Sequence, residues 1–162
     1  MRTFRKQCSR CVTRTAAPLF TLFDNHGTAH NLESYQGKVV LLNFWAPWCF
    51  NCAGELEAFQ ELKRFLGSEK FEVIAIAEVS PDEAKTFKYN FPLLFDGDKR
   101  VADQYRVAML PATYIIDKAG RIVSFPDPES ENSATVFQGP RGWNSLRVAR
   151  NIEALSGEYP FS

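Results

Sequence analysis

The sequence lacks an excess of charge of either sign, because 19 lysine and arginine residues balance 19 aspartate and glutamate residues among 162. Domains that bind nucleic acids usually concentrate positive charge on one face, so we expect no nucleic-acid partner. The sequence also lacks long hydrophobic runs. Its longest mostly apolar stretch, residues 39–46, has the length of a strand, whereas a transmembrane helix needs about 20 apolar residues. We therefore expect no membrane segment.

Acidic residues are missing from the start of the chain, where none precedes Asp24. Residues 1–17 instead carry several arginines and two cysteines, Cys8 and Cys11, without the apolar core of a secretory signal. Chain ends of this kind seldom pack against a domain. We expect residues 1–17 to form a disordered tail or an organelle-targeting segment. Residues 18–162 then form one domain, which is an ordinary size for a single hydrophobic core.

The hydrophobic pattern predicts an α/β domain. Residues 39–46 and 71–77 are almost entirely apolar, which is typical of central strands covered on both faces. Between them, apolar residues recur at three- and four-residue steps and predict a helix over about 50–66. The other expected elements are a hairpin of 19–23 and 29–32, a helix that starts at 80–83, a hairpin of 112–117 and 121–125, a polar loop insertion over 126–140, and a helix over 145–155.

Two cysteines, Cys49 and Cys52, lie where the strand at 39–46 passes into the predicted helix. A thiolate attacks a disulfide far faster than a thiol, and a free cysteine with a pKa of about 8.5 is mostly protonated at neutral pH. The unpaired N–H groups at a helix N-terminus favour the thiolate of Cys49. Cys52 lies one helical turn further on, so it could attack a mixed disulfide formed at Cys49. The pattern predicts a redox pair with Cys49 as the nucleophile and Cys52 as the resolving thiol.

Glu55 follows Cys52 by three residues, so the two side chains share one helix face. A buried resolving thiol needs a nearby proton acceptor, and a carboxylate at this spacing could serve. The same spacing suits a solvated glutamate that only benefits from the helix dipole. The residues alone leave both interpretations open.

Zinc binding is the main alternative for the Cys49-Cys52 pair, because a structural zinc site needs four ligands and Cys8 and Cys11 could complete one. That arrangement would fold the basic tail across the junction of strand and helix and would block the redox pair. We favour the redox interpretation, and we predict no metal and no bound cofactor.

Residues flanking the motif and one distant proline are candidates for contacts with the substrate. Trp48 and Phe50 border Cys49, and two aromatic side chains beside a partly exposed sulfur cannot both be deeply buried, so they could form an apolar docking collar. A cis bond between Leu110 and Pro111 would hold the Leu110 backbone where an extended substrate could pair with it. A trans Pro111 that only starts the next strand is the commoner alternative.

Residues 43–52, with the sequence NFWAPWCFNC, resemble the redox motif of the thioredoxin superfamily, and residues 110–113 (LPAT) resemble its cis-proline loop. With the N-terminal hairpin and Glu55, the chain is similar to the TlpA/ResA-like branch of cell-envelope thiol-disulfide oxidoreductases. The resemblance implies a thioredoxin fold: a central mixed β-sheet, flanking helices and an extra N-terminal β-hairpin. It also implies that Pro111 is cis. Ordinary thioredoxins have a buried aspartate at the position of Asn43, and this branch uses the glutamate at Glu55 instead, so Glu55 is the implied proton carrier.

These features together predict a thiol-disulfide oxidoreductase that exchanges a Cys49-Cys52 dithiol or disulfide with protein clients. We expect a monomeric reductant, re-reduced by a redox donor protein. The resemblance favours the cell envelope or periplasm, with the cytoplasm or an organelle as alternatives. Two other functions stay open. A peroxiredoxin-like peroxidase would want threonine or serine at Ala46, and a metal-binding module usually has a wider cysteine spacing and a later histidine.

Overall fold

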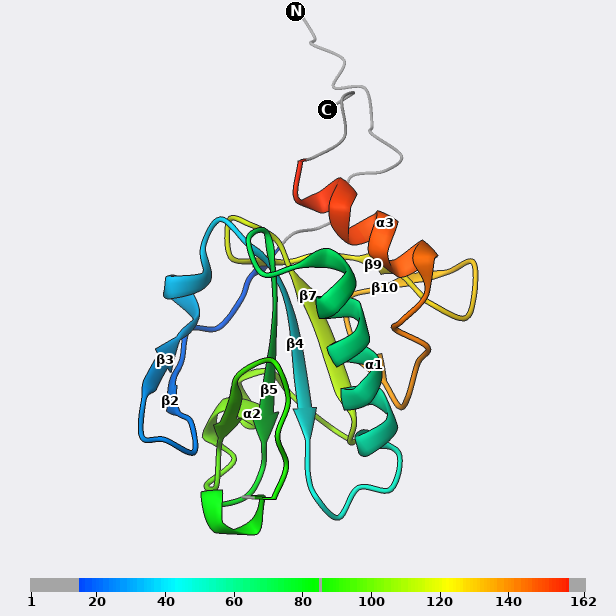
Figure 1. Cartoon of the computed structure of the whole chain (residues 1–162). Coiled ribbons are helices and arrows are strands. Elements are labelled where there is room, and N and C mark those ends of the chain that lie inside the picture. Colours follow the sequence, from blue (N-terminus) through cyan, green and yellow to red (C-terminus); the bar gives the residue numbers. More distant parts are fainter. Residues whose placement is uncertain (1–14, 85, 158–162) are drawn as a thin grey trace, which may run out of the picture.

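The computed structural model describes residues 15–84 and 86–157, and its centre is a mixed β-sheet (Figure 1). Its strands are β1 (Thr15–Ala16), β4 (Val39–Trp45), β5 (Phe71–Ala77), β6 (Leu93–Phe95), β7 (Ala112–Ile116) and β8 (Arg121–Ile122). They lie in the order β1-β8-β7-β4-β5-β6, and β11 (Phe137–Gln138) also pairs with β7. Strands β4, β5 and β6 are parallel, whereas β7 is antiparallel to β4 and β8 is antiparallel to β7. The predicted α/β class with a mixed sheet is confirmed.

Helices cover both faces of the sheet. Helices α1 (Cys52–Leu66) and α3 (Leu146–Leu155) lie on one face of the sheet (Figure 1). Their side chains join the hydrophobic core on that face. On the other face the core contains residues of α2 (Arg100–Gln104) and of the segment around the N-terminal hairpin of β2 (Thr21–Phe23) and β3 (Ala29–Asn31), including η1 (Leu32–Tyr35). The predicted extra hairpin is therefore confirmed. Within the described residues no helix is long and apolar enough to cross a membrane.

Strand β4 carries the position that matters most for the site. Its residues alternate between the two cores: Leu41 and Trp45 lie on the α1 face, and Leu42 and Phe44 lie on the other. Asn43 therefore shares the face of Leu41 and Trp45, and it lies opposite Thr113 of β7 in the register of the sheet. Two polar side chains are thus placed side by side under α1 in an otherwise apolar layer.

The helix predicted to start at residues 80–83 is only a single 3-10 turn, η2 (Pro81–Glu83). The start of this turn is capped, because the backbone N–H of Ser80 donates to Glu83 Oε2 at 3.0 Å. A helix does not continue because Phe87, Tyr89 and Phe91 turn toward the protein at every second position, which is the period of an extended chain. A helix start without an apolar repeat at 3.6-residue spacing does not propagate.

The segment predicted as a polar loop, residues 126–140, contains regular structure. Strand β9 (Phe125–Pro126) pairs with β10 (Ser133–Ala134), and β11 then joins the main sheet through Phe137, which lies opposite Thr113. At the N-terminus β1 pairs with β8, so the sheet starts before the expected boundary at residue 18. Residues 1–14, with Cys8 and Cys11 and the predictions made for that tail, lie outside the described residues.

Candidate redox site

Cys49 and Cys52 form a disulfide where the segment after β4 enters α1, with their Cα atoms 5.4 Å apart. Cys52 is the first residue of α1 and is only 1% exposed, whereas Cys49 is half-buried. The helix begins two residues later than the predicted residue 50, because turn-type bonds shape the chain before it. The N–H of Cys49 donates to the carbonyl of Ala46 at 3.0 Å, and the N–H of Cys52 donates to that of Cys49 at 3.2 Å. Cys49 therefore lies in the turn directly ahead of the helix N-terminus.

The aromatic side chains on either side of Cys49 face solvent, as predicted. Trp48 is 70% exposed and Phe50 is 96% exposed, which are high values for such large apolar groups. They place apolar surface on both sides of the half-buried sulfur.

The Leu110-Pro111 bond is cis, as the resemblance implied. Pro111 is buried, and its carbonyl accepts a hydrogen bond of 2.8 Å from the N–H of Gly139. Because Ala112 lies opposite Phe44, the loop at 110–111 is at the same end of the sheet as the end of β4 and the cysteines. Neither backbone group of Leu110 has a hydrogen-bond partner in the part of the chain that the structure describes.

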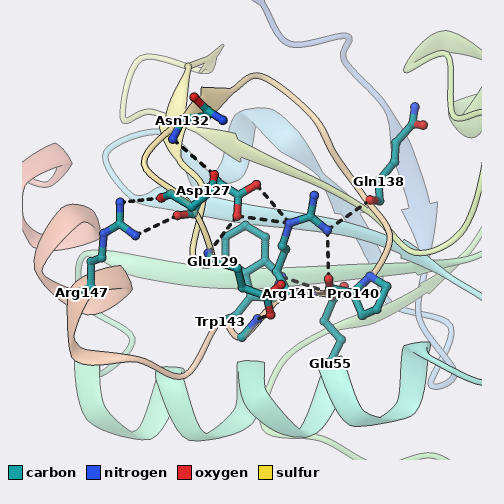
Figure 2. Close-up of polar contacts among 11 residues, drawn as sticks. Glu55, Asp127, Glu129, Asn132, Gln138, Pro140, Arg141, Trp143 and Arg147 are labelled. Atoms are coloured by element: carbon teal, nitrogen blue, oxygen red, sulfur yellow. Dashed lines mark hydrogen bonds and ion pairs between the residues drawn. The ribbon is translucent and has the colours of Figure 1, made fainter.

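Glu55 is buried under this site, with 3% of its surface exposed, so the interpretation as a solvated glutamate is wrong. Its Oε1 accepts from Asn43 Nδ2 at 2.9 Å and from the Thr113 hydroxyl at 3.4 Å. Its Oε2 accepts from the backbone N–H of Arg141 at 2.9 Å and from the indole Nε1 of Trp143 at 3.1 Å (Figure 2). Four donors from three separate segments therefore converge on one carboxyl group.

Burial raises the pKa of the Glu55 carboxyl from its ordinary 4.5 to about 7. The four hydrogen bonds act in the opposite direction, because each favours the charged form, but they do not cancel the loss of hydration. A carboxyl group with a pKa near neutrality can both take up and release a proton under ordinary conditions.

None of the four donors to Glu55 was among the predicted site residues: Asn43 was noted only as the position of an aspartate in ordinary thioredoxins, and Thr113, the Arg141 backbone and Trp143 were given no role. Thr113 could have been found, since it follows the proline loop on a strand that is otherwise apolar. Trp143 carried a weaker signal, as a single large aromatic residue near a polar, glycine-rich stretch. The Arg141 contact is made by the backbone and leaves no mark in the sequence.

Over residues 15–84 and 86–157, no three histidine, cysteine, aspartate or glutamate side chains gather closely enough to hold a metal ion. The zinc alternative that requires Cys8 and Cys11 falls outside these ranges.

The sequence profile of the AhpC/TSA family matches residues 13–125. The chain belongs to the AhpC/TSA family. One relative of this chain is the thiol-disulfide oxidoreductase ResA of Geobacillus thermodenitrificans (strain NG80-2), which is 35% identical to it over 113 residues. That alignment covers 67% of this chain and 65% of the relative, so the chain spans about two thirds of its length. The family profile ends before Arg141 and Trp143.

Solved structures of thioredoxin-like proteins share the fold of this chain. A thiol:disulfide interchange protein from Chlorobium tepidum TLS superposes with a TM-score of 0.68 at 22% identity, covering 90% of this chain and 98% of that one. The thioredoxin domain of a thiol-disulfide oxidoreductase from Bacteroides vulgatus gives 0.66 at 20% identity, covering 86% and 94%. The predicted thioredoxin fold is confirmed.

Proposed function

We propose that this chain is a thiol-disulfide oxidoreductase that reduces disulfides of protein clients through Cys49 and Cys52. The observation that carries the proposal is the disulfide-bonded pair, in which Cys52 is buried and Cys49 is half-buried between two exposed aromatic side chains. The attacking sulfur must be reachable by a client, and the resolving sulfur must be reachable only by its partner. The similarity to proteins named as thiol-disulfide oxidoreductases supports the same activity.

The reaction transfers two electrons to the client. The Cys49 thiolate attacks one sulfur of a client disulfide, forms a mixed disulfide and releases the first client thiolate. Cys52 then gives its proton to Glu55, and its thiolate attacks the Cys49 sulfur. The second client sulfur leaves as the Cys49-Cys52 disulfide forms. A dithiol donor protein later reduces that disulfide, and Glu55 returns the proton to Cys52.

Glu55 is the group we assign to this proton transfer. Its position one helical turn after Cys52 puts it on the buried face of α1, and among the buried side chains of this fully described helix it is the one carboxyl group. Its pKa of about 7 suits a group that must alternate between the charged and neutral forms.

We assign the contacts with clients to Trp48, Phe50, Leu110 and Pro111. The two aromatic side chains offer apolar surface beside Cys49, and the free backbone groups of Leu110 offer hydrogen bonds to an extended client strand. Pro111 follows Leu110 through a cis bond, and its carbonyl accepts a hydrogen bond from the N–H of Gly139. Because one chain contains every group in this scheme, we propose that it acts as a monomer, which light scattering on the purified chain tests.

The proposal is tested by trapping, with Cys8 and Cys11 replaced by serine and with insulin as the disulfide-containing client. Cys52→Ser should accumulate a mixed disulfide through Cys49, because the resolving thiol is gone, and Cys49→Ser should accumulate none. Equal trapping by both variants would contradict the assigned roles. Consumption of hydrogen peroxide by the wild type, without insulin reduction, would support the peroxidase alternative instead.

A further inference from the structure

The acceptor positions of Glu55 are all filled. A carboxylate offers about four lone-pair positions, and the four hydrogen bonds of Glu55 use two on each oxygen. Three of the four donors are N–H groups, which cannot accept a proton in return. The hydroxyl of Thr113 is the exception, because it can rotate and become an acceptor. The two oxygens of Glu55 are therefore not equivalent.

Both donors to Oε2 come from the segment that follows the family profile. Arg141 is held there by its own side chain, whose Nε pairs with Asp127 Oδ2 at 3.1 Å and whose Nη1 donates to the carbonyl of Pro140 at 3.0 Å (Figure 2). Gly139 anchors the same turn to Pro111. These bonds fix the backbone N–H of Arg141 in its direction toward Glu55.

Trp143 is held equally firmly by packing. Its side chain is fully buried, and its ring contacts Phe137 edge to face at a centroid distance of 5.2 Å, with Phe59 at 6.1 Å and Phe125 at 6.4 Å. These three rings belong to β11, α1 and β9, so three elements set the orientation of the indole. A group surrounded in this way can present its N–H to Glu55 without reorganisation.

We propose that Trp143 is a positioning residue for the proton transfer: together with the Arg141 backbone it holds Oε2 of Glu55 between two N–H donors and directs the transferred proton to Oε1. The inference rests on the proposed function, since the proton is the one that leaves Cys52. The Cys52 S–H bond breaks and the Oε1–H bond forms, which gives a thiolate and a neutral carboxyl group. The Thr113 hydroxyl then accepts from Oε1 while it still accepts from Asn43 Nδ2, which lies at 3.0 Å.

Few charged groups near Glu55 could change its pKa besides the hydrogen bond from Trp143. Asn43 and Thr113 are neutral, and Cys52 does not titrate while it is in the disulfide. From the 138–143 segment the one charged side chain is Arg141, and its guanidinium group is paired with Asp127. Because the Trp143 bond favours the charged carboxylate, its loss should raise the pKa of Glu55 further.

The test is a carbon-detected NMR titration of the Glu55 carboxyl in the oxidised full chain. Trp143→Phe keeps an aromatic ring but removes the N–H, and the midpoint should move from about 7 upward by about one pH unit. Trp45→Phe is the matched control. Trp45 is also buried, but its Nε1 has no hydrogen-bond partner among the described residues, so the midpoint should stay in place. An unchanged midpoint in Trp143→Phe, or equal shifts in both variants, would overturn the inference.

A second measurement needs no change at Trp143 and therefore does not depend on the folding of that variant. The indole Nε1–H resonance of Trp143 in the wild type should titrate with the midpoint of Glu55, and it should stop titrating in Glu55→Gln. The resonance of Trp45 should follow neither. A Trp143 resonance that is independent of pH would overturn the inference.

The two proposals can fail separately. If the wild type reduces insulin while neither NMR signal behaves as described, the positioning role of Trp143 is wrong and the oxidoreductase stands. If the wild type does not reduce insulin, the proposed function fails, and with it any role of Trp143 in that transfer, whatever the NMR signals show.

Discussion

The side-chain amide of Asn43 joins Glu55 to Thr113, because its Nδ2 donates to Glu55 Oε1 at 2.9 Å and to Thr113 Oγ1 at 3.0 Å. Asn43 and Thr113 are register partners on neighbouring strands, and both side chains lie beneath α1. A neutral donor in this place satisfies a buried carboxyl group without adding charge. In the proposed mechanism the proton carrier, Glu55, is therefore on the helix rather than on the strand.

Replacing Asn43 by aspartate should destabilise the oxidised chain in a pH-dependent way. The new carboxyl group would lie against Glu55 Oε1, and two carboxylates this close cannot both ionise without a large penalty. We expect a loss of about 3 kcal/mol in the free energy of unfolding at pH 8 and a smaller loss at pH 5. Urea unfolding measures both values. Asn132→Asp, at an exposed position, is the control and should change stability by less than about 0.5 kcal/mol.

Glu55 should make the oxidised chain less stable as the pH rises. Its pKa is about 7 in the folded chain against 4.5 ordinarily, so between these values the folded state binds more protons than the unfolded state. The free energy of unfolding therefore decreases through this window, by about 3 kcal/mol in total. Relative to Glu55→Gln, the wild type should lose this amount between pH 4 and pH 8 in urea unfolding. Parallel stability curves for the two proteins would contradict the assignment.

Truncating the exposed aromatic residue after Cys49 should weaken the recognition of clients. Phe50 is 96% exposed, so its burial against a client would remove most of a large apolar side chain from water. Phe50→Ala should raise KM for insulin about tenfold with a smaller change in kcat. Phe65→Ala is the matched control, since Phe65 is 65% exposed on α1 but lies near the other end of the helix. Equal effects of the two changes would argue against a docking collar.

The ion pair of Arg141 with Asp127 should stabilise the 126–141 segment. Both side chains are mostly buried, and the guanidinium group also donates to the carbonyls of Gln138 and Pro140. Arg141→Met should therefore lower the free energy of unfolding by about 2 kcal/mol. Arg100→Met removes an exposed ion pair with Asp98 and should cost less than about 1 kcal/mol. Similar losses for both, measured by urea unfolding, would show that the Arg141 contacts add little.

The parts of the molecule that follow local patterns could be predicted from the sequence. Continuous apolar runs identified β4 and β5, and the spacing of Leu56 and Phe59 identified α1. The pair of cysteines at the junction of strand and helix pointed to the redox chemistry. The predicted helix after Ser80 failed because its capping residues form a local signal that the following residues do not continue.

The surroundings of Glu55 could not be predicted, because they depend on contacts between distant segments. Trp143 lies 88 residues after Glu55, and no spacing rule links the two. The segment before Trp143 looks like a loop in the sequence, because its strands have only two residues each: β9 and β10 pair with each other, and β11 pairs with β7. Because this region of the sequence is polar, nothing in it indicated that Arg141 and Trp143 supply two of the four hydrogen bonds to Glu55.

The most direct test of the account is the reduction potential of the Cys49-Cys52 pair, measured by equilibration with defined glutathione or dithiothreitol ratios after Cys8 and Cys11 are replaced by serine. We expect a reversible two-electron couple at about −270 mV or below, as for reducing members of this fold. A couple near about −120 mV would instead indicate an oxidant. The absence of any reversible couple would contradict the central claim that Cys49 and Cys52 carry out thiol-disulfide exchange.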